Sequence, residues 1–178
     1  MPGESLNAQG ASDIAGDTLQ YDNEFWRFSL AVYGRAVVAE ECLALQQAIG
    51  ADVNILLFCS WMGARGIALN RDDIESIMSH VVVWQDHVVG PLRTIRQNMK
   101  SLQVGGSENF RMRIKAIELE AEQIEQAILF AYSQRFHSGP KNARDAATEN
   151  IKRYVEIKSG QKTFAAPLLV EAALQRCS

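Results

Sequence analysis

Val53-Asn54-Ile55-Leu56-Leu57-Phe58-Cys59-Ser60-Trp61-Met62 is the longest apolar stretch of the chain. Its length is about half of the ~20 residues that a membrane-spanning helix needs. Asp52 stands where a residue can cap a helix N-terminus, and Gly63 and Gly66 follow where a helix can end. The stretch therefore predicts a core helix over residues 53–64.

The segments outside this stretch repeat their apolar residues every three or four positions, which is the period of a helix. Gly90-Pro91 is expected to break or kink the chain, Gly105-Gly106 to form a tight loop, and Ser107 to cap a long helix that reaches about Arg135. The apolar positions are Ile74, Ile77, Val81, Trp84 and Val88; then Leu92, Ile95, Met99 and Leu102; then Phe110, Ile114, Ile117, Ala121, Ile124, Ile128 and Ala131.

These patterns predict an all-α fold, a single-domain bundle of about seven or eight helices over residues 22–178, with a long sixth helix. No segment of useful length alternates with the period of a strand. Residues 1–21 are rich in Gly, Ser, Ala and Asp and have no apolar period, so we expect a disordered tail there.

The composition, the cysteines and the N-terminal residues favour a cytoplasmic location for this chain. The net charge of −3 does not indicate overall binding to nucleic acid or to an anionic membrane. Cys42, Cys59 and Cys177 are far apart and form no Cys-x-x-Cys pair, as expected for reduced thiols in a bacterial cytosol. No signal peptide is expected, because no Lys or Arg precedes Arg27. We therefore predict a cytoplasmic protein that does not enter a membrane.

Three segments resemble a family of conserved hypothetical proteins of proteobacteria: Phe25-Trp26-Arg27-Phe28-Ser29-Leu30-Ala31-Val32-Tyr33, Gly50-Ala51-Asp52-Val53-Asn54 and Val88-Val89-Gly90-Pro91-Leu92-Arg93. The Gly-Ala-Asp-Val-Asn segment is the most specific of them. The chain departs from the family at Ala36-Val37, where a Pro-Gly pair usually stands. The resemblance implies a small helical domain with no established activity, ligand or catalytic residue.

The chain offers little support for catalysis or for a cofactor. His80 and His87 are seven residues apart on one helix face, about 10 Å along the axis, which is too far to share an ion. No Gly-x-Ser-x-Gly elbow is present, and Cys59 lies between apolar neighbours that make a thiol inert. We therefore predict no catalytic residue, no metal ligand and no cofactor.

One charge asymmetry stands out. Six cations and one anion lie between Gly90 and Ile117, and four acids without a base follow in residues 118–125. If the two helices around Gly105-Gly106 pair antiparallel, residues whose numbers sum to about 211 face each other. Arg93 is then expected to face Glu118. The remaining cations are expected to form a basic patch at the tip, and they are Arg96 beside Lys115 and Lys100 beside Arg111.

Three functions remain open at this point. The first is a non-catalytic protein-interaction or regulatory module with an unknown protein partner. The second is a binder of nucleic acid or another anionic ligand through Arg96, Lys100, Arg111 and Lys115. The third is an enzyme with a pocket between helices. The oligomeric state is open, and a homodimer is one possibility.

Overall fold

The computed structural model describes residues 19–102, 104–137, 141–160 and 164–177. These residues form eight α-helices and no strand, which confirms the predicted all-α bundle with a long sixth helix. The helices are α1 (Glu24–Tyr33), α2 (Ala36–Ile49), α3 (Val53–Ala64), α4 (Arg71–Trp84), α5 (Gly90–Asn98), α6 (Ser107–Ser133), α7 (Ala143–Ser159) and α8 (Pro167–Cys177).

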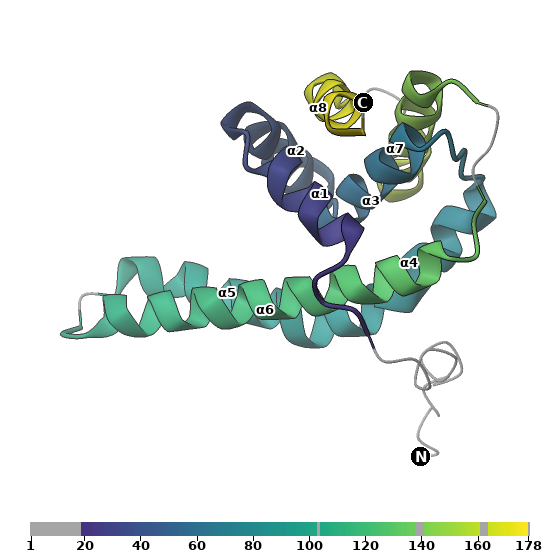
Figure 1. The fold of residues 1–178 in the computed structure, drawn as a ribbon. Helices are drawn as coiled ribbons and strands as arrows, with labels where there is room; N and C mark the ends of the chain where they lie inside the picture. The colour runs from purple at the N-terminus through teal and green to yellow at the C-terminus, as the bar shows by residue number, and fades with distance from the viewer. Residues whose placement is uncertain (1–18, 103, 138–140, 161–163, 178) are drawn as a thin grey trace, which may run out of the picture.

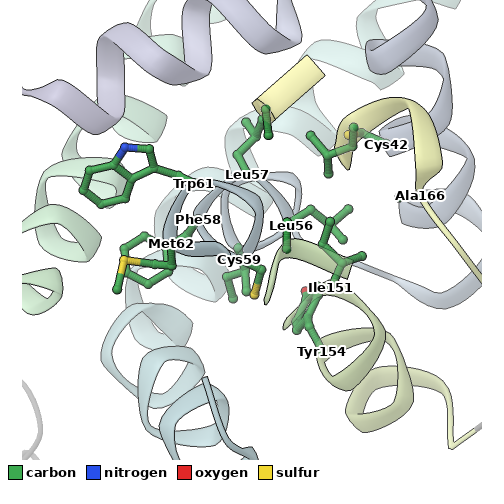
Figure 2. Close-up of a cluster of buried hydrophobic side chains, with 14 of the residues drawn as sticks. Cys42, Leu56, Leu57, Phe58, Cys59, Trp61, Met62, Ile151, Tyr154 and Ala166 are labelled. Carbon is green, nitrogen blue, oxygen red and sulfur yellow. The ribbon is translucent and has the colours of Figure 1, made fainter. Parts of the chain in front are cut away.

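The predicted core helix α3 is the centre of the molecule. Every residue from Asn54 to Gly63 is buried, so this helix has no solvent-facing side. The helices α1, α2, α7 and α8 surround it (Figure 1). Figure 2 shows its side chains, among them Leu56, Phe58 and Trp61, pointing in different directions into these neighbours. A helix that is apolar all round can only be stable when other helices cover it completely.

The contact between α3 and α7 depends on small residues. A Cβ atom built on Gly63 would lie 2.1 Å from the Cα atom of Ala147, so no larger residue fits there without movement. This close approach lets Asn150 of α7 reach the chain beyond α3, where its side chain donates to the carbonyl of Ile67 and accepts from the backbone N–H of Leu69. Glycine at position 63 is therefore a packing residue as well as a helix terminator.

The helix ends follow the sequence with one exception. Asp52 accepts a hydrogen bond from the N–H of Asn54 (2.8 Å) and caps α3 as predicted. Asn70 and Asp73 form a capping box at the start of α4. The predicted cap of α6 is wrong, because Gly106 occupies the capping position with a φ of 81° and Ser107 is the first helical residue. Only a residue that tolerates positive φ suits that position.

Gly90-Pro91 does not break the chain. A π-helical turn over Gln85–Val89 joins α4 to α5, and the N–H of Gly90 donates to the carbonyl of Gln85, five residues back. Proline has no N–H to offer, and its ring excludes the normal carbonyl position four residues earlier. The extra residue of the π turn accommodates this change, and the helix continues. The predicted break is therefore replaced by a change of helical pitch.

The helices α4, α5 and α6 form a long antiparallel bar, and the other five helices gather on one side of it (Figure 1). We call the free end of this bar the arm and define it as residues 90–102 and 104–120. α5 packs against α6, the π turn and a short 3₁₀ turn over Met99–Ser101, and it has no buried residue of its own. The arm is thus a two-helix hairpin that projects from the body.

Most of the predicted tail, residues 1–18, lies outside the described residues. Of its last three residues, Tyr21 contacts α6, where its carbonyl accepts from the side chain of Gln123 (3.2 Å). In the part of the chain that the structure describes, no helix is both long and apolar enough to cross a membrane.

Candidate functional site

A cluster of polar residues lies where the N-terminus of α3 meets α6 and α7. Asp52 begins α3, and its backbone N–H donates to the hydroxyl of Tyr154 on α7 (2.7 Å). Asn54 is buried, and its side-chain oxygen accepts from Gln126 on α6 (2.8 Å). The expected structural hydrogen bond of Asn54 is therefore present, and the Gly-Ala-Asp-Val-Asn segment connects three helices.

Glu125 is the unusual member of this cluster. Its side chain is 0% exposed, and neither of its oxygens has a hydrogen-bond donor within the described residues. Burial raises the pKa of Glu125 well above its ordinary value, the carboxylate of Asp52 raises it further, and the amide of Asn54 opposes the rise. One oxygen of Asp52 is likewise buried without a donor in the same part of the structure. These surroundings favour the protonated, neutral form of the Glu125 carboxyl group, which can donate a hydrogen bond to Asp52.

Arg93 and two glutamates of α6 hold the base of the arm together. Arg93 lies 3.2 Å from Glu118 and 2.7 Å from Glu122, as the predicted pairing with Glu118 requires. Arg96 also binds Glu118. Burial alone would raise the pKa of Glu118, but hydrogen bonds and charge from Arg96 and Arg93 outweigh it and lower the pKa. These ion pairs are more than half buried, so water screens them less than pairs at an open surface.

Two hollows lie on either side of Arg93. The first, about 660 Å³, is lined by Asp52, Gln85, Asp86 and Tyr154 among others and lies beside the π turn. The second, about 410 Å³, lies between the arm and helices α1 and α2, and Trp26, Leu30, Leu43 and Leu119 line it. Both volumes lie within the range of about 300–1,000 Å³ that is typical of small-molecule sites. We call the second hollow the groove.

The four predicted anion-binding residues are only partly brought together. Arg96 and Lys115 both line the groove, whereas Lys100 lies in the 3₁₀ turn and Arg111 near the start of α6. Lys115 is the expected neighbour of Arg96, yet Arg96 binds Glu118 one turn further along α6, because the long guanidinium side chain reaches that far. Arg111 binds Glu108 at 2.8 Å.

The chain therefore neutralises two of these four cations. Lys100 and Lys115 have no ion pair among the described residues. The mutual repulsion of all four, from which we predicted an anion, is weaker than expected. Whether the set binds an anion stays a prediction.

The opposite side of the arm is apolar. Ile95 and Leu102 of the α5 segment are 46% and 53% exposed, and Phe110 and Ile117 of α6 are 50% and 46% exposed. Phe110 and Ile117 are seven residues apart on α6, which is two helical turns, so they lie on one face. Leu102 follows the 3₁₀ turn and lies beyond the end of α5. Ile95 lies about 200° round its helix from Gln97 and Ile117 about 200° from Lys115, and both Gln97 and Lys115 face the groove.

Because both rotations lead away from the groove, Ile95, Phe110 and Ile117 share the far face of the hairpin. We call this the outer face. This face contains part of the apolar pattern that predicted the two helices, but its side chains remain about half exposed to solvent. A two-helix hairpin has this difficulty in general, since each helix has one neighbour where a bundle helix has two.

Sequence reasoning missed two features of this site. It did not predict the burial of Glu125, although Glu125 stands four residues after Ala121 on the inward side of α6, a signal that could have indicated burial. It also could not show that the apolar stripe of residues 110–124 is partly exposed, because periodicity shows which residues share a face but not whether a neighbour covers that face.

The fold and the site together define a class, the all-helical proteins built as a globular body with a projecting helical hairpin. Residues 24–129 match the family described as "Protein of unknown function (DUF2390)", and the chain belongs to that family. The match covers α1 to α5 and most of α6, and therefore includes the arm and all of the polar cluster except Tyr154. Comparison with curated proteins and with solved structures gave no match.

Proposed function

We propose that this protein is a non-catalytic interaction module that docks on a protein partner through the outer face of the arm. The observation that carries this proposal is the half-exposed set Ile95, Phe110 and Ile117 on one face of a projecting hairpin. Exposed apolar side chains that lie together mark interaction sites more often than scattered ones do. Helices that present apolar residues at i and i+7 are a common way to fill a partner's groove.

A protein partner fits this face better than nucleic acid does. A nucleic-acid site needs several free cations along one surface to neutralise phosphates. Of the predicted patch, Arg96 and Arg111 already have acid partners, and the cations lie away from the apolar side chains. Binding of an acidic ligand through Lys115 in the groove and Lys100 at the tip of the arm is the second candidate, supported by their lack of an ion pair in the described parts of the chain.

The enzyme alternative rests on the hollow of about 660 Å³ beside the π turn, which is large enough for a small molecule. π turns are frequent at functional sites. The groups that line the hollow include Asp52 and Tyr154, and both are occupied in holding the start of α3. This arrangement favours a structural role for them over a catalytic one.

A bacterial cytoplasm is the location that we propose. Cys42 and Cys59 are buried free thiols, and burial raises the pKa of each to about 12. Thiols of this kind stay reduced and inert, as in a reducing compartment. The resemblance to proteobacterial proteins supports the bacterial source.

Site-specific photo-crosslinking in living cells tests the interaction. A photoreactive phenylalanine at position 110 should give a discrete protein adduct, because this position lies in the proposed docking face. The same group at Met112 is the matched control, since Met112 is 48% exposed on the same helix but lies about 200° away. Absence of an adduct from position 110, or equal adducts from both positions, would contradict the proposal.

A further inference from the structure

We propose that the partner of the outer face is a second copy of this chain, and that two arms pack tip to base as an antiparallel four-helix bundle. This inference rests on the proposed function and names its partner. Its first support is shape: each arm has half of the apolar layer that a four-helix bundle needs. A twofold interface can use a single surface on both copies, provided that the surface is complementary to itself.

The apolar positions meet this condition. A twofold axis through the level of Ile117 places each residue of α6 beside a residue equally far on the other side of Ile117. Phe110 then packs against the partner copy near Ile124, which is half-buried. On the other helix, Ile95 lies at the same level by the pairing across the loop.

The charges select the direction of the pairing. Two arms packed tip to tip would place Arg113 of one copy beside Arg113 of the other and Glu120 beside Glu120, and these like charges would repel one another. Two arms packed tip to base place Arg113 of each copy toward Glu120 of the other copy. Electrostatics therefore favours the antiparallel arrangement.

One specific pair follows from this register. Arg113 and Glu120 are both exposed, lie seven residues apart on one edge of the outer face, and have no ion pair within the described residues. They are about 10 Å apart along α6, which is too far for them to bind each other. The residues three and four positions from each of them carry no opposite charge. The axis near Ile117 places Arg113 of one copy beside Glu120 of the other, twice in each dimer.

The experiment is sedimentation equilibrium of the full-length protein over a concentration series. The wild type should approach twice its monomer mass. Arg113→Glu and Glu120→Arg should each weaken self-association by about tenfold or more, because each places two like-charge pairs in the interface. Mixing the two variants should restore the dimer, since every cross-pair then joins a glutamate to an arginine.

Two further variants separate this surface from the rest of the arm. Ile117→Glu should abolish the dimer, and Leu119→Glu, a change at a residue 50% exposed on the groove side, should leave it intact. A wild type that is monomeric at all concentrations, or a mixture of the charge variants that stays monomeric, would overturn the inference. If position 110 still crosslinks in cells to a protein of different mass, the proposed function stands and only the second copy is wrong.

Discussion

At the scale of single residues, Glu125 is the most informative side chain because it is a carboxyl group with no exposure and no protein donor in the described structure. A neutral carboxyl is the form that such surroundings favour. In the unfolded chain the same group ionises near its ordinary pKa. Because the pKa of Glu125 is higher in the folded protein, folding takes up a proton between the unfolded and the folded pKa, and the stability of the protein is linked to pH at this residue.

We predict that Glu125→Gln removes part of the pH dependence of folding. A raised folded pKa gives stability that is complete below the unfolded pKa of about 4.5 and is lost as pH rises through the folded value. The wild type should thus lose up to about 1.4 kcal/mol per pH unit above 4.5, and the variant should not, because a glutamine carries no proton to lose. Urea unfolding of both proteins from pH 5 to 8 measures this difference.

Glu118 affects the stability of the protein in the opposite pH range. Its lowered pKa gives stability that is lost only as pH falls below about 4.5. The two effects are therefore separable along one pH series. Parallel stability curves of the wild type and Glu125→Gln above pH 5 would show that Glu125 is ionised in the folded protein.

The predicted basic set can also be tested at this scale. We expect Lys100→Glu with Arg111→Glu to abolish retention on heparin if the set binds anions, and to reduce the slope of log affinity against log salt by about 2 for two lost contacts. The fold should stay intact, because Lys100 is exposed and the Arg111 pair with Glu108 is a surface pair.

Lys152→Glu with Lys158→Glu is the matched control for the heparin experiment. Both lysines are exposed on α7, and the pair changes the net charge by the same amount away from the arm. Equal loss of retention in the two double variants would mean that heparin responds to total charge, and the basic set would then be ordinary surface.

At the scale of elements, the close packing of α3 against α7 is the contact that we expect to matter most for the stability of the body. We predict that Gly63→Ala lowers stability by about 1–3 kcal/mol, since its new methyl group would overlap the backbone of Ala147 and force the helices apart. This corresponds to a fall in melting temperature of several degrees, roughly 2–4 °C for each kcal/mol. Differential scanning calorimetry measures the change.

Gly105→Ala is the control for Gly63→Ala, because a Cβ atom at Gly105 would meet nothing within 4 Å and its φ is not positive. Its melting temperature should stay close to that of the wild type. If both substitutions are equally mild, α3 and α7 can separate freely, and the close packing at Gly63 does not limit stability.

The elements themselves were predictable from local signals. The bounds expected for α3, buried between Asp52 and Gly66, agree with the structure because capping residues and an apolar run act within one segment. The link from α4 to α5 was not predictable. The π turn depends on which carbonyl accepts the N–H of Gly90 when Pro91 has no N–H of its own, and the sequence pattern of a kinked helix is the same as that of a broken one.

At the scale of the whole molecule, the sequence could not show that the hairpin projects. The stripes of α5 and α6 have the same spacing as a core stripe, so Phe110 and Ile117 are indistinguishable from Ile128 until the body is placed. The same holds for charge. The basic and acidic blocks were visible in the sequence, whereas their division into paired Arg96 and unpaired Lys115 depends on side-chain reach.

Because the arm projects from the body, we predict that the body keeps its stability when the arm is shortened. Deleting residues 96–102 and 107–113 removes seven residues from each side of the arm: the end of α5 with the 3₁₀ turn and Leu102, and the first two turns of α6. None of the deleted residues is fully buried, and the core around α3 is untouched. The ion pair of Arg96 with Glu118 is lost, but Arg93 still binds Glu118.

We therefore expect the shortened protein to unfold cooperatively at a melting temperature within a few degrees of the wild type, while adducts at the outer face and self-association disappear. Calorimetry and sedimentation of the same sample measure both results. A collapse of the melting transition would mean that the arm is a structural part of the bundle. In that case its half-exposed apolar residues would serve folding, and they would no longer support an interaction surface.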